Sequence, residues 1–275
     1  MVFLNRRNLV RAAALAVATA SLVGMAQAQT VDEIKKRGVL RVGILADLPP
    51  WGFVGRDGKP TGYDADVASL LGKKIGVPVE FIGTTSAART ALLMTGKADV
   101  LIATVGMYAD RAKVVQFTKP YATMGITVIG KKALPVTKME DLGSYRVGVS
   151  RSSIMDNTIT AGAPKTATIQ RFDDEATSIQ ALVSGQVDLI GGNTTYFQNI
   201  NKAVPNHSFE HKFYITRQYM GMATRPGQKD INVYLNKFID EITDSSELNA
   251  IYKKYIGDDM PALAARIDGV PYSVQ

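Results

Sequence analysis

The chain has 275 residues, of which 46% are hydrophobic, and its formal net charge is +7. No run of Lys and Arg exceeds three residues, so this modest basic excess does not indicate a nucleic-acid-binding protein. The absence of cysteine excludes disulfides, and it also excludes a lipid anchor attached to a cysteine. A chain of this length can stabilise itself by burying a hydrophobic core in one or two domains.

The first 28 residues predict an export signal rather than part of the fold. Three arginines by position 11 give a basic start, residues 12–25 are apolar but too short to span a bilayer, and residues 26–28 form a small-x-small cleavage site. An ordinary secretory signal and a twin-arginine signal both fit this pattern. Cleavage near Ala28 leaves 247 residues with a net charge of +4 and no further apolar stretch of membrane length.

The first half of the remaining chain alternates strand and helix patterns. Residues 39–45 (VLRVGIL) predict a buried strand, and Asp57-Gly58 in a turn-rich stretch predicts a hairpin. Over residues 64–76 the apolar side chains fall on one helix face, with a glycine at the end. The alternation continues with a strand over 77–83, a helix over 87–96, a strand over 97–103 and a short helical turn over 111–117. Such alternation is typical of an α/β sheet with crossover connections.

The second half repeats the pattern of the first. In residues 89–103 and again in 178–192, a helix ends at glycine, and an aspartate then precedes a buried strand. We therefore expect two similar α/β lobes. The extended, glycine-containing segments 124–132 and 219–227 would connect them, so that one lobe is inserted in the other with a cleft between. The expected boundaries are 29–125 with 220–275 for lobe 1 and 126–219 for lobe 2, and amphipathic helices over 231–242 and ending at 257 complete lobe 1.

Arg111 stands just after a strand pattern ends, where ligands gather in open α/β sheets. We expect Asp110 to cap a helix that begins with Arg111, and the Thr104 hydroxyl, Gly106 amide and Arg111 guanidinium to converge on one volume. A guanidinium with two parallel N–H groups matches a carboxylate. The alternative is a surface arginine balanced by Asp110.

Five motifs carry a family resemblance. The segments LRVGILADLPPWGF, GKPTGYDADVASLLGKKIG, GKADVLIA, DRAKVVQFTKPY and LNAIYKKYIG resemble, in order and spacing, the family 3 extracellular solute-binding proteins, the amino-acid-binding components of ABC importers. The likeness runs from Val39 to Gly257. It implies a type II periplasmic binding protein fold, with two lobes that each contain a mixed β-sheet flanked by helices, joined by two hinge strands. It also implies a periplasmic monomer that needs no cofactor and no metal, and that delivers an amino acid or related carboxylate to a membrane permease.

The resemblance assigns roles to residues of lobe 1. Arg111 stands where the family's arginine binds the ligand α-carboxylate, and Thr104 and Gly106 stand where a hydroxyl and an amide assist it. Trp51 takes the place of an aromatic wall that stacks on the ligand, although simple packing under the hairpin is the alternative.

Further positions would shape the pocket. Ser153 would bind the same carboxylate from lobe 2, with plain helix capping as the alternative, and Ser150 would line the pocket. Ser86 replaces an aromatic of many relatives, and Arg89 stands where binders of acidic amino acids carry an arginine, unless it is an exposed helical residue. The resemblance therefore favours glutamate, aspartate or a similar polar amino acid.

Position 193 departs from the family, because Asn193 replaces an aspartate that pairs with the ligand ammonium. An amide oxygen can accept one hydrogen bond from an ammonium but loses the charge-assisted part, about 1–2 kcal/mol. Either another acid compensates, with Glu175 and Asp174 as candidates, or the ligand is a keto acid or other carboxylate without an amino group.

Two other classes of function fit less well. A cyclohexadienyl dehydratase-like enzyme on the same fold would use a cleft acid such as Glu175, but we expect no catalysis. A sensor would require a separate receptor. His207 and His211 have a spacing that can hold a metal on a helix, yet their surroundings favour a loop, so we expect no metal site.

Overall fold

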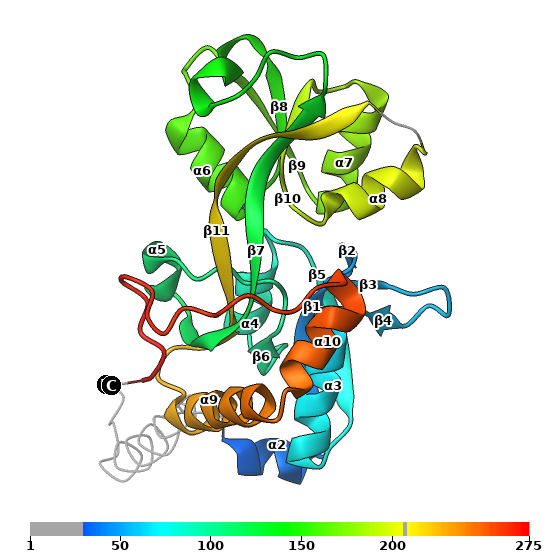
Figure 1. The fold of residues 1–275 in the computed structure, drawn as a ribbon. Helices are drawn as coiled ribbons and strands as arrows, with labels where there is room; N and C mark the ends of the chain where they lie inside the picture. The colour runs from blue at the N-terminus through cyan, green and yellow to red at the C-terminus, as the bar shows by residue number, and fades with distance from the viewer. Residues whose placement is uncertain (1–29, 206–207, 275) are drawn as a thin grey trace, which may run out of the picture.

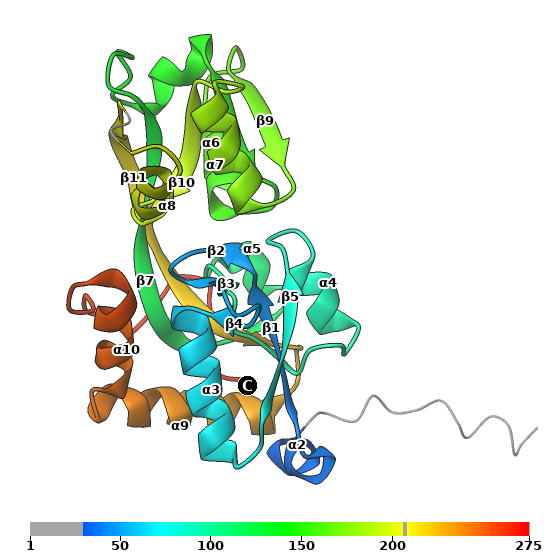
Figure 2. The ribbon, with the colours of Figure 1, turned by 90° about the vertical axis from the view of Figure 1, so that its right-hand side faces the viewer.

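The computed structural model describes residues 30–205 and 208–274, so the predicted export signal lies outside the described residues. Figure 1 shows two α/β lobes connected by two long strands, and Figure 2 shows the same arrangement from the side. In the described ranges, no helix has the length and apolar character needed to cross a bilayer.

Lobe 1, the lower lobe in Figure 1, contains both ends of the described chain. Its strands and helices occupy the first and last parts of the sequence. They are α2 (Val31–Arg37), β1 (Leu40–Leu45), β2 (Asp47–Leu48), β3 (Gly52–Val54), β4 (Pro60–Thr61), α3 (Tyr63–Ile75), β5 (Val79–Thr84), α4 (Arg89–Met94), β6 (Val100–Leu101), α5 (Ala109–Ala112), α9 (Lys229–Asp244) and α10 (Glu247–Ile256).

Lobe 2, the upper lobe, is formed by the middle of the chain. It begins with a 3-10 helix and continues with alternating strands and helices. They are η2 (Met139–Ser144), β8 (Arg146–Ser150), α6 (Ile154–Gly162), β9 (Thr168–Phe172), α7 (Glu175–Ser184), β10 (Leu189–Asn193) and α8 (Tyr196–Ala203).

Two strands, β7 (Gln116–Lys131) and β11 (Phe209–Thr224), run antiparallel through both lobes. The hydrogen-bonded order is β5-β1-β6-β11-β7-β10-β8-β9, so the predicted pair of sheets is continuous through these shared strands. In lobe 1 the strands β5, β1 and β6 are parallel, and in lobe 2 the strands β9, β8 and β10 are parallel. The predicted boundaries at 125/126 and 219/220 fall inside β7 and β11, and they stay a prediction.

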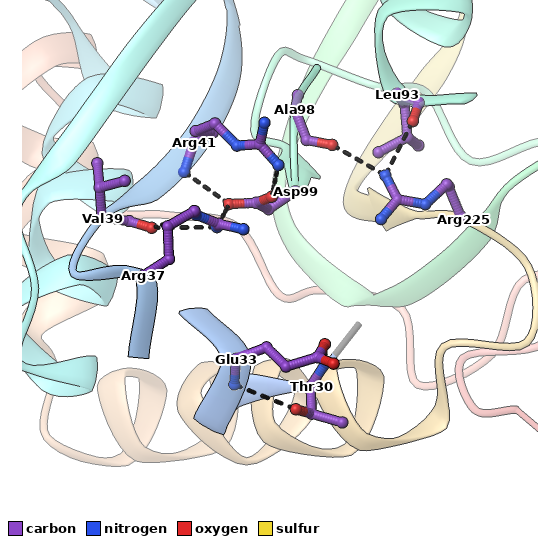
Figure 3. A network of polar contacts seen from close by, with 9 residues as sticks. All are labelled: Thr30, Glu33, Arg37, Val39, Arg41, Leu93, Ala98, Asp99 and Arg225. Carbon is purple, nitrogen blue, oxygen red and sulfur yellow. Dashed lines mark hydrogen bonds and ion pairs between the residues drawn. The ribbon is translucent and has the colours of Figure 1, made fainter. Parts of the chain in front are cut away.

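The expected repetition of the two halves is confirmed in detail by two aspartates. Asp99, just before β6, accepts hydrogen bonds from the backbone N–H of Arg41 on β1 and from its guanidinium, both at 2.8 Å, and it also pairs with Arg37 (Figure 3). Asp188, just before β10, makes the same backbone and guanidinium bonds to Arg146 on β8. In each lobe the carboxylate therefore ties two neighbouring parallel strands together.

Other predicted elements are also present, with shifted ends. The hairpin around Asp57-Gly58 joins β3 to β4 in antiparallel pairing. The helix expected over 87–96 is shorter, since α4 spans only Arg89–Met94. The helical turn expected to begin at Arg111 begins earlier, because α5 starts at Ala109 and its N-cap is Tyr108. The expected capping by Asp110 is wrong, since Asp110 forms an ion pair with Lys113 instead.

Candidate functional site

A small cavity lies between the two lobes, and side chains of both lobes line it. Its volume of about 20 Å³ admits about one water molecule, so a larger ligand requires the lobes to separate and side chains to move. Six of the ten predicted site residues line it, three from lobe 1 and three from lobe 2, and five further residues complete the wall. The lining residues are Ser86, Arg89, Thr104, Ser153, Glu175 and Asn193, with Leu48, Met124, Ile154, Met155 and Gln218.

Hydrogen bonds across the cleft keep the lobes together in this structure. The indole N–H of Trp51 donates to the Thr195 hydroxyl at 3.0 Å, and Asn199 Nδ2 donates to the carbonyl of Pro49 at 3.0 Å. Because each bond joins one lobe to the other, the conformation described here is the closed one.

Arg89 is the guanidinium that faces the cavity. It lies at the start of α4 and is 3% exposed. Its Nη1 donates to the carbonyl of Ala103 at 2.7 Å and more weakly to that of Thr104 at 3.4 Å, which fixes the plane of the group. Burial and the nearby Arg111 lower its pKa to about 9, which still leaves it charged at neutral pH. The exposed helical arginine considered from the sequence is therefore wrong.

Thr104 occupies a left-handed backbone conformation, with φ of 47°, three residues after the end of β6. This region is uncommon for residues other than glycine and needs support from neighbours. Asp64, fully buried at the start of α3, provides it by accepting the Thr104 N–H at 2.9 Å and the Tyr121 hydroxyl at 2.7 Å. Burial raises the pKa of Asp64 to about 7.

Glu175 is a buried carboxylate at the first turn of α7, 3% exposed. One oxygen accepts a hydrogen bond from the Ser86 hydroxyl across the cleft at 3.2 Å, and the other accepts one from the Tyr196 hydroxyl. Burial raises the pKa of Glu175. Among the described residues no lysine or arginine forms an ion pair with it.

Asn193 lies at the end of β10, and its amide oxygen does not have the role expected from the sequence. Its Oδ1 accepts hydrogen bonds from the Thr195 N–H at 2.9 Å and the Thr195 hydroxyl at 2.6 Å. The oxygen that was expected to accept a bond from a ligand ammonium is therefore already in use, and Nδ2 is the atom left without a partner.

Arg111 does not line the cavity. Its Nη1 donates to the Gly106 carbonyl at 2.8 Å, and its Nη2 donates across the cleft to the Ser152 carbonyl at 3.3 Å. The side chain borders an outer groove of about 500 Å³ between α5 and α6. The expected convergence of Arg111 with Thr104 and Gly106 is thus incomplete in the closed conformation, although the positive charge of Arg111 still acts on Arg89.

Three further predicted residues, Trp51, Ser150 and Ser153, have structural roles or are buried near the cavity. Trp51 is fully buried in an aromatic cluster, with its ring 5.4 Å from that of Tyr63, so packing accounts for its position. Ser150 is fully buried at the end of β8. Ser153 both lines the cavity and caps α6, since its hydroxyl accepts the Asp156 N–H at 3.1 Å. Direct ligand contact by these three residues stays a prediction.

Only one histidine of the pair, His211, lies in the described part of the chain. His207 lies outside the described residues, and His211 lies on β11 with its ring 4.3 Å from that of Phe197. Within residues 30–205 and 208–274, no group of His, Cys, Asp or Glu is arranged to hold a metal ion.

Sequence reasoning missed three residues of the site. Asp64 and Asp47 both carry a carboxylate beside the cleft, and Thr195 fixes the orientation of Asn193. The only local signal for Thr195 is weak: an asparagine side chain often accepts from the backbone N–H two residues later, as in an Asx turn, and Asn193 does so with Thr195. Asp64 and Asp47 had no such signal, since an acid at a helix start or in a turn is usually exposed.

Comparisons with known proteins agree with this fold. The chain is 29% identical over 266 residues to the L-cystine-binding protein TcyJ of Escherichia coli K12, which covers 94% of this chain and 97% of that protein. The structure of an ancestral arginine-binding protein bound to arginine matches with a TM-score of 0.76 and 31% identity, covering 80% of this chain and 99% of that one.

The ancestral amino acid-binding protein AncCDT-1, a precursor of cyclohexadienyl dehydratase, matches with a TM-score of 0.74 and 31% identity, covering 82% of this chain and 98% of that one. The model of the bacterial extracellular solute-binding proteins, family 3, matches residues 40–258. The chain therefore belongs to family 3 of the bacterial extracellular solute-binding proteins.

Proposed function

We propose that this protein is a periplasmic monomer that captures a polar or acidic amino acid between its lobes and delivers it to the permease of an ABC importer. One observation carries the proposal. A buried cation, Arg89, and a buried carboxyl group, Glu175, line the same interlobe cavity without forming an ion pair with each other. An amino acid is a zwitterion, and its two charges would offset the cost of burying each group.

The closed conformation fits a capture mechanism. The ligand would bind first to lobe 1, where Arg89 and Arg111 supply positive charge for a carboxylate. Closure would then bring Ser153, Glu175 and Asn193 of lobe 2 onto it, as their place in the cavity wall supports. A ligand shifts the equilibrium only by its preference for the closed state, which the permease would then recognise.

The test is a binding screen on protein that has been unfolded and refolded to remove any bound metabolite. Amino acids, 2-oxo acids and dicarboxylates are compared by thermal shift, and hits are confirmed by calorimetry and solution scattering. We expect an amino acid to raise the melting temperature and to reduce the radius of gyration. Arg111→Ala should abolish that response while leaving the ligand-free melting temperature almost unchanged. If only 2-oxo acids bind, the ligand is a carboxylate that lacks an amino group, and the proposed amino acid ligand is wrong.

A second candidate, a dehydratase, is favoured by the likeness to AncCDT-1 and by the buried acid Glu175. It predicts that prephenate or arogenate incubated with the protein yields an aromatic product that absorbs in the ultraviolet. We expect no product, and turnover that is lost in Glu175→Gln would instead establish catalysis.

A further inference from the structure

The amide group of Asn193 has a fixed orientation that determines what it can bind. Asn193 is 1% exposed and lines the interlobe cavity. Its Oδ1 accepts two hydrogen bonds from Thr195, whereas Nδ2 is buried without a hydrogen-bond partner. A buried polar nitrogen without a partner is costly, and it marks a position where a ligand atom can supply the missing acceptor.

The direction of each bond follows from the donors available. The indole N–H of Trp51 can only donate, so at 3.0 Å the Thr195 hydroxyl must accept from it. The hydroxyl proton of Thr195 is then free to point to Asn193 Oδ1, and the Thr195 backbone N–H points to the same oxygen. Turning the amide over would place its NH₂ group against the Thr195 N–H, donor against donor.

Asn193 is therefore a hydrogen-bond donor to the cavity. An ammonium group has three donors and no acceptor, so it has nothing to bind at this amide. A carboxylate, carbonyl or hydroxyl oxygen, in contrast, can accept from Nδ2.

Glu175 has the opposite character at the same cavity. Its two oxygens accept from Ser86 and Tyr196, and a hydrogen bond from Ser150 also acts on the pKa of the group. A carboxylate has about four acceptor positions, so one is left for a further donor. It is buried, and in the described part of the chain no lysine or arginine lies close enough to form an ion pair with it. Burial raises its pKa, and the charge of Arg89 at longer range acts in the opposite direction. A ligand ammonium beside Glu175 would favour its ionised form and offset the cost of burying it.

We propose that Glu175 binds the ammonium group of the ligand and that Asn193 donates a hydrogen bond to a ligand oxygen. The inference rests on the proposed function, because it assigns the groups of a bound amino acid. The two residues then select together for a ligand that carries both an ammonium group and an acceptor oxygen within one small volume.

The test compares ligands that differ only in the amino group. The probes are L-glutamate with (S)-2-hydroxyglutarate, and L-aspartate with L-malate, titrated calorimetrically into refolded protein. For the wild type we expect the amino acid of at least one pair to bind more tightly. Glu175→Gln should reduce this preference at least tenfold. The amino acid loses the interaction between its ammonium group and the Glu175 carboxylate, whereas the hydroxy acid has no ammonium group and loses no such interaction.

Asn193→Asp tests the other half. This substitution should lower the affinity for the amino acid about tenfold, because a carboxylate oxygen of Asp at position 193 would then face the ligand oxygen. Gln180→Glu adds the same charge at an exposed position of α7, and it should leave both affinities unchanged. Melting curves of each ligand-free variant confirm that it is folded.

The outcomes separate the two proposals. An unchanged preference in Glu175→Gln, or tighter amino acid binding in Asn193→Asp, overturns the assignment of groups while the proposed function stands. Failure of the wild type to bind any amino acid overturns the proposed function, and the assignment falls with it.

Discussion

Asp47 in lobe 1 caps helix α7 of lobe 2. Its carboxylate accepts the backbone N–H of Glu175 at 2.7 Å and that of Ala176 at 3.4 Å. The helix also has its own N-cap, Asp174, which accepts the Thr177 N–H at 2.7 Å. The first two N–H groups of α7 thus gain a charged acceptor only while the lobes are closed.

Asp47→Ala should therefore weaken closure rather than folding. Loss of a helix cap costs about 1 kcal/mol, which corresponds to about fivefold in the affinity of an amino acid that binds the closed state. Calorimetry measures the affinity, and Asp57→Ala on the exposed hairpin serves as the control. Equal affinities in Asp47→Ala and the wild type would show that this cap does not contribute to closure.

Removing the guanidinium that faces the cavity should also abolish binding. Arg89→Met keeps much of the side-chain volume but removes the charge and the bonds to the carbonyls of Ala103 and Thr104. We expect at least a hundredfold loss of amino acid affinity, because a buried carboxylate would lose its charged partner. Arg56→Met, at an exposed turn, is the matched control. Retained affinity in Arg89→Met would place the ligand carboxylate on Arg111 alone.

The buried carboxyl of Asp64 should make stability depend on pH. Its pKa is raised from 3.8 to about 7 in the folded protein, mainly by burial, so the folded state keeps a proton that the unfolded state has lost. The free energy of unfolding should then fall as pH rises from about 4 to about 7 and level off above that. The groups facing Asp64 are the Tyr121 hydroxyl, the Thr104 N–H and the charge of Arg89.

Urea unfolding of ligand-free protein at several pH values checks this prediction. Asp64→Asn cannot titrate at this position, so its unfolding free energy should fall less steeply over the same range, whatever its absolute value. Burial raises the pKa of Glu175 and of Asp47 as well, and these two groups give the variant a residual slope of the same sign. Identical slopes in the variant and the wild type would contradict the raised pKa.

The two strand-tying aspartates should differ in their contribution to stability. The Asp99 side chain is fully buried between two arginines, whereas that of Asp188 is 31% exposed. Asp99→Ala should lower the free energy of unfolding by about 3 kcal/mol, because it removes a fully buried carboxylate that accepts from the Arg41 backbone N–H and from two partly exposed guanidinium groups. Asp188→Ala should cost about 1 kcal/mol, as partly exposed pairs do. Chemical denaturation compares them, and equal losses would show that burial does not set the difference.

The sequence predicted the architecture well because local patterns determine most of it. Hydrophobic runs, glycine stops and the repeated helix-Gly-x-x-Asp-strand order predicted both lobes and two extended connecting segments, although β7 and β11 begin earlier than those segments. Side-chain polarity at the cavity was harder to predict. Whether the Asn193 amide donates to or accepts from a ligand depends on its bonds to Thr195. The hydroxyl of Thr195 is in turn oriented by Trp51, which precedes Thr195 by 144 residues in the chain. No periodicity or spacing encodes a hydrogen bond of that range.

The path of the chain through β7 and β11 determines how lobes could be exchanged between related proteins. The chain enters lobe 2 on one strand and returns on its antiparallel neighbour, with Thr123 paired to Tyr219 and Gly125 to Arg217. The two crossing points are thus adjacent in space although about ninety residues apart in sequence. A whole lobe can therefore be exchanged with that of a relative through two splices that lie side by side, which leaves the connectivity of the other lobe intact.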